Sequence, residues 1–355
     1  MYNKQDATMT KGLAILCMVI LHLFCRKGAD VYGTPLLWVG PGVPLVYWFG
    51  FYSEICVHIY SICAGYTLFR EYSLSLKWKE SYRTVIRRLP RLLINYWVVV
   101  CLFSVVGLLV RSQNTIPGSF SDFLMNIFLL RSYNGAWWYM NTYILLTVLS
   151  PLLLFPIRRL SAELGVTISL VISVIWYVLN RFNIISVIPR KAVLSFVYEE
   201  CKNLIDILPA VWIGAAFCKG KIFDRINEKW KAEKYQLRIL ATWIILFVVT
   251  NIIEKAVFVL PCAALTFILF NLWIKPKWIK QVFLFLGKHS TNIWLTHMFF
   301  YLVLFKGLVQ KAEYPVFMLG FMLILCIATS YVVMAIEKNV LALIQYSRNT
   351  RKIKV

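Results

Sequence analysis

The chain has 355 residues, of which 60% are hydrophobic and 16% aromatic, and its mean hydropathy is +0.70. Values this high exclude an ordinary water-soluble domain and indicate a protein with many membrane spans. The 38 Lys and Arg outnumber the 16 Asp and Glu, which gives a net charge of +22. Basic loops kept on the cytoplasmic side explain this excess, and no motif places the charge in a groove, so we expect no nucleic-acid partner.

Ten apolar segments are long enough to cross about 30 Å of hydrocarbon. They lie at 9–26, 45–69, 89–111, 137–157, 164–180, 203–219, 237–253, 256–274, 290–307 and 315–340. Asp206 and Pro209 fall inside the sixth segment, and a short turn around Glu254 and Lys255 joins the seventh to the eighth. We therefore expect an all-α membrane protein: one polytopic bundle of about ten transmembrane helices over 1–355, with no separate soluble domain.

The distribution of basic residues orients these spans. With the N-terminus inside, 27 of the 38 Lys and Arg lie on the cytoplasmic side and 11 on the outer side. Because cytoplasmic loops carry the excess of Lys and Arg, we expect both termini in the cytoplasm and a multi-pass location in a cell membrane. Lys4 and Lys11 precede the first span, but no small-residue cleavage site follows it, so we expect this span to stay uncleaved.

The stretch "KGLAILCMVILH" begins with Lys11 and ends with His22. Eleven residues at 100° each make about three turns, so both side chains face the same way along about 16 Å of helix. His22 can exchange protons near neutral pH, which suits a base that takes a proton from a hydroxyl acceptor. The alternative is a histidine that only donates to a neighbouring carbonyl. Lys11 either acts in the chemistry or marks the membrane boundary.

The second span contains Glu54 and His58, which stand four residues apart and share a helix face. The carboxylate could hold the imidazole in one tautomer, or the two groups could simply neutralise each other inside the membrane. Both interpretations remain open from the sequence.

Between the second and third spans, "SYRTVIRRLPRLL" places Arg88 and Arg91 one helical turn apart, with Pro90 suited to a helix start. Arginines at a helix N-terminus are opposed by the helix dipole unless an anion lies between them and the exposed N–H groups. This pattern predicts a cytoplasmic phosphate or diphosphate site. Positive-inside bias alone would also place arginines here.

Two later stretches contain further candidates. "NGAWWYMNTYILLTVLSPLL" places Trp137, Trp138 and Tyr139 at the outer end of the fourth span, where an aromatic belt is expected. "LGKHSTNIWLTHMFF" places His289 at the cytoplasmic edge and His297 inside the ninth span, where it can join a polar interior.

The nine cysteines include no CxxC pair. Cys17, Cys101 and Cys262 lie in apolar runs and are expected to be small buried hydrophobic residues. No spacing typical of metal ligands occurs, and the Walker, GxSxG and dinucleotide-binding patterns are missing. We expect no metal cofactor.

In order and spacing, these features resemble the acyltransferase-3 family of integral membrane acyltransferases. Lys11 and His22 are similar to the family's basic-x10-His pattern, and Arg88 and Arg91 to its Arg-x-x-Arg pattern. "WYMNTYILLTVLSPLL" is similar to its Trp-Tyr stretch with a distant Ser-Pro, and "LGKHSTNIWLTH" to its Gly-Lys-x-Ser and Leu-x-His stretch. The second span departs from the pattern: "HIYSICAGY" stands where the family shows an aromatic pair and Ser-Gly.

The resemblance implies a membrane O-acyltransferase of the bacterial inner or plasma membrane, of the class that transfers groups other than aminoacyl groups. It would move an acyl group, usually acetyl, from cytoplasmic acyl-CoA (acetyl-CoA) to a hydroxyl of an extracytoplasmic glycan or related acceptor. His22 would be the base or acyl-handling residue, with Lys11 as its partner, and Arg88 with Arg91 would contact the CoA phosphates. We add Glu54 and His58 as catalytic candidates, and as substrate-binding candidates Trp138, Tyr139 and His297.

Two other functions compete with acyl transfer. Glu54, His58 and His22 could form the proton relay of a transporter or flippase for a small polar solute or glycan precursor. A polysaccharide polymerase or ligase is less compatible, because such proteins carry a large outer loop bearing arginines, and no loop here is long enough. The acceptor, the acyl chain and the oligomeric state stay open.

Overall fold

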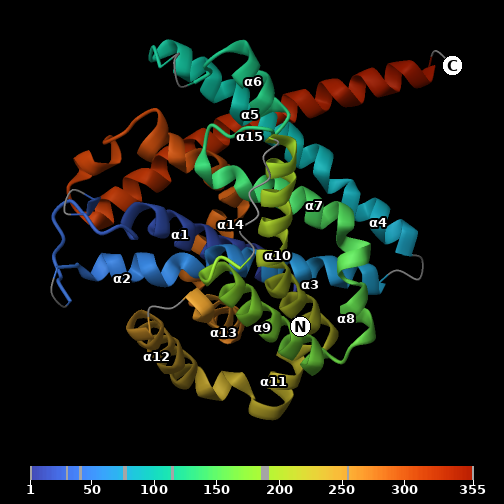
Figure 1. The fold of residues 1–355 in the computed structure, drawn as a ribbon, viewed down its shortest axis with the longest axis vertical. Coiled ribbons are helices and arrows are strands. Elements are labelled where there is room, and N and C mark those ends of the chain that lie inside the picture. Colours follow the sequence, from blue (N-terminus) through green and yellow to red (C-terminus); the bar gives the residue numbers. More distant parts are fainter. Residues whose placement is uncertain are drawn as a thin grey trace. The chain divides into compact units, whose positions relative to one another are not determined.

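The structure is a computed structural model that describes residues 2–28, 31–39, 42–74, 78–112, 116–184, 192–253 and 256–353. These residues form helices and no β-strand, apart from one isolated β-bridge between Trp38 and Pro44 (Figure 1). The all-α prediction is confirmed. The predicted turn at Glu254 and Lys255 lies outside the described residues.

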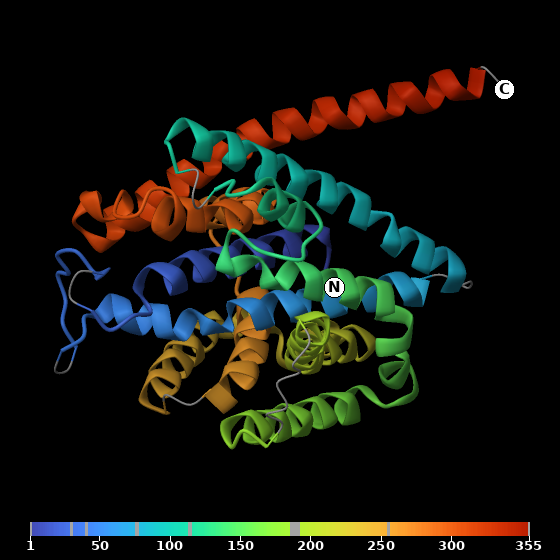
Figure 2. The same ribbon diagram turned by 45° about the horizontal axis from the view of Figure 1, so that its top comes forward.

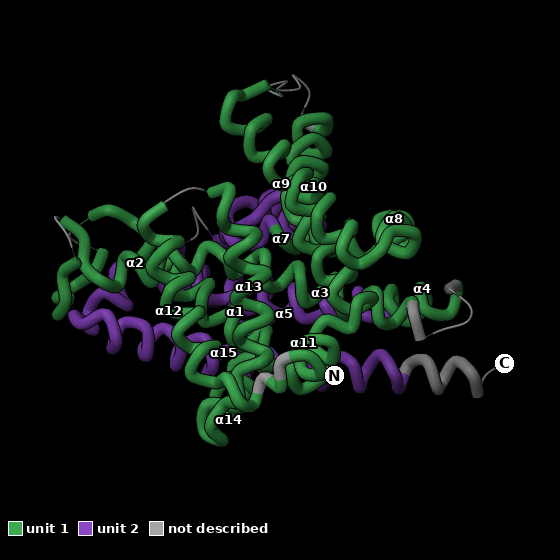
Figure 3. The backbone as a smooth tube through the Cα atoms, turned by 90° about the horizontal axis from the view of Figure 1, so that it is seen from below, with its two compact units in different colours: residues 1–86, 139–290 green, residues 87–138, 291–355 purple. Residues whose placement is uncertain are grey.

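The chain divides into two compact units, which Figure 3 colours separately. Unit 1 comprises Met1–Ile86 and Tyr139–Ser290, and unit 2 comprises Arg87–Trp138 and Thr291–Val355. The helices of unit 1 are α1 (Lys4–Phe24), α2 (Leu45–Tyr52), η2 (Ser53–Ile55), α3 (Cys56–Leu74), α4 (Trp78–Ile86), α7 (Trp138–Leu153), α8 (Phe155–Arg159), α9 (Ala162–Arg181), α10 (Ala192–Lys219), α11 (Ile222–Trp230), η4 (Ala232–Tyr235), α12 (Gln236–Ile253), η5 (Ala256–Phe258), α13 (Val259–Leu272) and the first part of α14 (Lys277–Met298).

The boundary between the two units falls within α14, between Ser290 and Thr291. The other helices of unit 2 are α5 (Arg88–Leu109), α6 (Phe120–Ile127), η3 (Gly135–Trp137), the π-helical turn η6 (Phe299–Val303), η7 (Val309–Ala312) and α15 (Pro315–Ile353). Helix α15 packs against α5, and Figure 2 shows the two crossing. An aromatic stack between Phe103 of α5 and Phe299 of η6, with ring centroids 3.9 Å apart, fills part of the core of unit 2.

Seven helical stretches in the described ranges are long and apolar enough to cross a membrane. They are Lys4–Phe24, Lys79–Leu109, Gly135–Arg159, Ala162–Arg181, Val193–Lys219, Glu233–Ile253 and Pro315–Tyr346, and the apolar stretch Ala256–Leu272 is shorter. The chain is therefore a polytopic all-α membrane protein. The count of ten spans and the cytoplasmic location of both termini stay predictions.

Several predicted segments differ in their boundaries from the helices observed, among them the ninth and the sixth. Helix α14 begins at Lys277 and not near residue 290, because the lysines in its first half excluded that half from a purely apolar segment. Helix α10 begins at Ala192 and not near 203, and it continues through Asp206 and Pro209. A charged residue or a proline within a membrane helix can be accommodated by its neighbours in a bundle.

Glycines allow α3 and α10 to pack closely within unit 1. A Cβ atom on Gly65 would lie 1.9 Å from the carbonyl oxygen of Val211, and one on Gly214 would lie 2.0 Å from the carbonyl oxygen of Ile62. Such reciprocal contacts are typical of membrane helix pairs, where small residues let backbones approach. Gly65 belongs to "HIYSICAGY", the stretch of the second span that differs from the family pattern. Its role there is to let the two helices pack closely.

Helix α1 lies beside α3, as Figures 1 and 2 both show. It also meets α14 through a glycine, since a Cβ on Gly287 would lie 1.9 Å from the carbonyl oxygen of Thr8. Of the cysteines expected to be buried, Cys17 and Cys262 are buried, but Cys101 is exposed. Cys101 lies on the outward face of α5. An apolar run in the sequence does not show which of its residues face outward.

Candidate active site

Helix α1 carries Lys11 and His22. Its start is fixed by a capping box, in which the Asn3 side chain accepts from the backbone N–H of Asp6 and the Asp6 carboxylate accepts from that of Asn3. Lys11 is exposed, whereas His22 is half-buried in the last turn. The helix is unbroken from Lys4 to Phe24, so the two side chains lie on one face about 16 Å apart along its axis.

A layer of hydroxyl groups adjoins the backbone at Lys11 in unit 1. The Tyr60 hydroxyl of α3 donates to the carbonyl oxygen of Lys11 at 3.3 Å, and Ser290 of α14 hydrogen-bonds to the same tyrosine. The neighbouring Ser61 hydroxyl lies 3.2 Å from the hydroxyl of Tyr139, and both of these residues are buried. Three helices, α3, α7 and α14, thus contribute hydroxyls to one buried polar layer beside α1.

Sequence reasoning missed Tyr60, Ser61 and Ser290 as parts of this layer. The sequence shows these residues inside apolar spans. Serine is common in membrane helices, however, because its hydroxyl can donate to a backbone carbonyl of its own helix. Ser61 donates to Val57 at 2.9 Å, and Ser290 donates to Gly287 at 2.9 Å. Only the packing of the helices shows which of them also has a partner on another helix.

Glu54 and His58 do not form the pair that their spacing predicts. The turn η2 contains Glu54 and interrupts the helix before His58, and the Glu54 carboxylate accepts from the Cys25 thiol at a distance of 3.9 Å. The carboxylate that acts electrostatically on His58 is Asp206 of α10. Asp206 itself accepts from the indole N–H of Trp176 at 3.1 Å. In the described part of the chain, no hydrogen bond joins Glu54 to His58, and the buried Nδ1 of His58 has no hydrogen-bond partner.

We expect a double-mutant cycle to separate the two carboxylates. His58→Gln combined with Asp206→Asn should show a coupling energy of about 0.5–3 kcal/mol, because the Asp206 carboxylate acts electrostatically on the imidazole. His58→Gln combined with Glu54→Gln should be additive. Thermal unfolding of the single and double variants in detergent measures both couplings. Equal coupling of His58 to Glu54 would contradict the arrangement in the structure.

Arg88 and Arg91 lie in the first turn of α5 in unit 2, as the sequence predicts for this helix start. Arg88 is half-buried, and the Arg91 side chain is 76% exposed. Arg91 has a partner that the sequence did not indicate: its Nε donates to Glu337 of α15 at 2.8 Å. The second oxygen of this carboxylate accepts from Asn95 at 3.2 Å. The two arginines therefore place their charge at the N-terminal end of α5, and Arg91 is fixed to the neighbouring helix α15.

The predicted aromatic belt is wrong for Trp137 and Tyr139. Trp137 is 2% exposed and donates from its indole N–H to the carbonyl oxygen of Leu295 at 3.0 Å, and Tyr139 faces the hydroxyl layer. Their polar atoms have partners inside the protein, so these rings are interior and not at a lipid interface. Trp138 is half-buried.

His297 is fully buried in unit 2. Its Nδ1 lies 3.1 Å from the carbonyl oxygen of Ile293 and 2.9 Å from that of Trp294. Carbonyls only accept, so Nδ1 carries the hydrogen in a neutral ring, and Nε2 carries the lone pair. The prediction of a polar interior position for His297 agrees with this burial, and its role in substrate binding stays a prediction.

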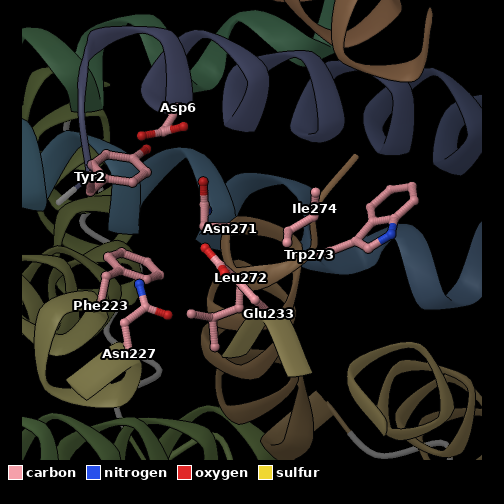
Figure 4. Close-up of a pocket in the computed structure, with 9 residues that line it drawn as sticks. All are labelled: Tyr2, Asp6, Phe223, Asn227, Glu233, Asn271, Leu272, Trp273 and Ile274. Atoms are coloured by element: carbon pink, nitrogen blue, oxygen red, sulfur yellow. The ribbon is translucent and has the colours of Figure 1, made fainter. Parts of the chain in front are cut away.

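A cavity of about 180 Å³ lies at the N-terminal end of α1, in unit 1. Figure 4 shows the rings of Tyr2 and Phe223 on one side of it and the Asp6 carboxylate above. The other lining residues are Asn227, Glu233, Asn271, Leu272, Trp273 and Ile274. The lining holds two carboxylates and no cationic side chain, which disfavours the phosphates of a nucleotide. The cavity is also about 24 Å along α1 from His22, so it does not enclose that histidine.

Of the predicted site residues, Lys11, His22, Glu54, His58 and Tyr139 belong to unit 1, and Arg88, Arg91, Trp138 and His297 belong to unit 2. Among the described residues, no three His, Cys, Asp or Glu side chains are grouped so that they could hold a metal ion.

Apolar helices that enclose histidines, carboxylates and hydroxyls define an integral membrane protein with a polar interior. A family model described as an acyltransferase domain matches residues 7–336. The chain therefore belongs to the acyltransferase-3 family and is a membrane acyltransferase. Comparisons with curated proteins and with solved structures gave no match.

Proposed function

We propose that this acyltransferase moves an acetyl group from cytoplasmic acetyl-CoA to a hydroxyl of an extracytoplasmic glycan. The observation that supports this most directly is the placement of His22 within the matched region. It lies in the last turn of the unbroken helix α1, three turns from Lys11 and half-buried, where contact with water is restricted.

The reaction requires little beyond positioning and proton transfer. A thioester is already activated, so the acceptor hydroxyl attacks its carbonyl carbon while His22 takes the hydroxyl proton. The carbon–sulfur bond then breaks, the ester forms, and the CoA thiolate leaves and accepts a proton. His22 begins and ends the cycle neutral. Lys11 contributes either to the electrostatics of the proton transfer or only to marking the membrane boundary on α1.

The charged part of CoA cannot enter the hydrocarbon, so its phosphates must bind at the membrane face. Arg88 and Arg91 supply guanidinium groups there, and guanidinium matches phosphate oxygens in charge and geometry. The pantetheine arm carries no charge and can therefore enter a membrane interior that excludes the phosphates.

We expect Arg88→Ala combined with Arg91→Ala to weaken acetyl-CoA binding at least about tenfold, because two charge-assisted contacts to phosphate are lost. The dissociation constant of purified protein, measured by calorimetry in detergent, checks this. Arg158→Ala combined with Arg159→Ala on α8 removes the same charge elsewhere and serves as the control. Unchanged affinity in the first variant would leave Arg88 and Arg91 with a topological role only.

The function itself is tested by product analysis. Membranes that contain the protein, supplied with radiolabelled acetyl-CoA, should place label covalently on a glycan fraction, and the glycan mass should rise by one acetyl group. Uptake of a solute into vesicles without covalent transfer would instead favour the transporter alternative.

A further inference from the structure

Glu337 is a buried carboxylate near the middle of α15, with only 6% of its surface exposed. Both of its oxygens are engaged within unit 2: Oε1 accepts from Nε of Arg91 at 2.8 Å, and Oε2 accepts from Nδ2 of Asn95 at 3.2 Å. A buried charge is tolerated when it is paired and hydrogen-bonded in this way. Two donors from one helix, four residues apart, also prevent the carboxylate from rotating.

Arg91 contributes only one of its donor groups to this arrangement. The side chain is 76% exposed, although its Nε is bound to a carboxylate whose own side chain is 8% exposed. The guanidinium is planar, so anchoring Nε fixes the directions of the two terminal nitrogens as well. The described residues supply no hydrogen-bond partner for those nitrogens, which lie on the exposed part of the side chain.

An anchored guanidinium binds an anion better than a freely rotating one, since less rotamer freedom is lost on binding. The anchor also distinguishes Arg91 from a residue that only follows the positive-inside bias, because such a residue needs no buried partner. The chain holds Arg91 by a residue 246 positions later in the sequence, at the helix start where Arg88 also lies.

We propose that Glu337 is a positioning residue, which fixes the Arg91 guanidinium so that its terminal nitrogens receive a phosphate group of the acyl-CoA donor. This inference rests on the proposed function, and it adds a residue outside the Arg-x-x-Arg pattern to the donor site. A phospholipid headgroup offers the same phosphate chemistry, so the experiment must separate the two sources.

The test compares steady-state kinetics with two donors, acetyl-CoA and S-acetylpantetheine, which lacks the phosphates. Glu337→Ala should raise the KM for acetyl-CoA about tenfold and leave kcat and the KM for S-acetylpantetheine within about twofold. Arg91→Lys should behave similarly, although it keeps the charge, because one ammonium group cannot both hold Glu337 and face a phosphate. Glu337→Gln keeps an acceptor for Nε and should restore most of the affinity. Arg225→Ala, which removes an exposed ion pair with Glu163 on other helices, is the control.

Several outcomes would overturn the inference. A parallel rise in KM for both donors would show that Glu337 only supports the fold. An unchanged KM for acetyl-CoA together with a changed dependence on anionic phospholipid would assign Arg91 to a lipid. If Glu337→Ala does not fold, Arg91→Lys decides the matter, because it leaves the buried carboxylate paired. A wild-type protein that transfers nothing from acetyl-CoA would refute the proposed function, whereas an active wild type with an indifferent Glu337 refutes the positioning role alone.

Discussion

His22→Ala will lose acyl transfer: we expect kcat to fall at least about 100-fold while acetyl-CoA still binds. A positioned general base contributes this much to a transfer in which the acceptor hydroxyl must lose its proton. His22 lies in the last turn of α1, three turns from Lys11, so its removal leaves the N-terminal part of the helix intact. Initial rates and the dissociation constant for acetyl-CoA, measured on the same preparation, separate catalysis from binding.

The control for His22→Ala is a histidine outside the site. His289 of α14 is 1% exposed, and His289→Gln reports what replacing a buried histidine does to folding alone. His22→Gln adds a second variant that can hydrogen-bond but cannot act as a base near neutral pH. A folded His22→Gln protein with normal turnover would refute the catalytic assignment.

Gly65→Val should destabilise the protein strongly. The position has no room for a Cβ, since that atom would lie 1.9 Å from the carbonyl oxygen of Val211, and this backbone atom cannot swing aside. Helices α3 and α10 would have to separate, which removes contacts along both. Overpacking typically costs about 1–3 kcal/mol, and a clash with the backbone of a neighbouring helix belongs at the upper end or beyond.

Gly320→Ala is the matched control for Gly65→Val. Gly320 lies in α15, and no atom lies within 4 Å of a Cβ placed on it. Alanine should therefore raise stability slightly, by about 0.5–1 kcal/mol, through helix propensity alone. The midpoints of thermal unfolding in detergent check both variants, and a Gly65→Val protein as stable as wild type would show that α3 and α10 do not pack as the structure has them.

Hydropathy and helical spacing were sufficient to predict the all-α class and the course of most helices. They were also sufficient to place Lys11 with His22 on one helix and Arg88 with Arg91 at a helix start. These features depend on residues that are close in sequence. The start of α14 was missed because an amphipathic first half lowers the mean hydropathy without breaking the helix.

Partners on distant helices could not be predicted. The i,i+4 spacing favoured Glu54 for His58, but η2 interrupts that helix, and α10 places Asp206 near the imidazole instead. Glu337 gave no signal, since a single carboxylate in a long apolar helix does not indicate which of many arginines it meets. Pairing of this kind is decided by how helices pack, which no local pattern records.

The contact between α3 and α10 has a consequence for biogenesis. Gly65 and Gly214 are 149 residues apart, so α3 is synthesised and inserted well before α10 reaches the membrane. Until then, lipid acyl chains must cover the face of α3 at Gly65, and they must leave it when α10 arrives. Assembly of this unit is therefore a lateral exchange of lipid for protein that follows insertion, and the lipid composition at the site of synthesis will influence its rate.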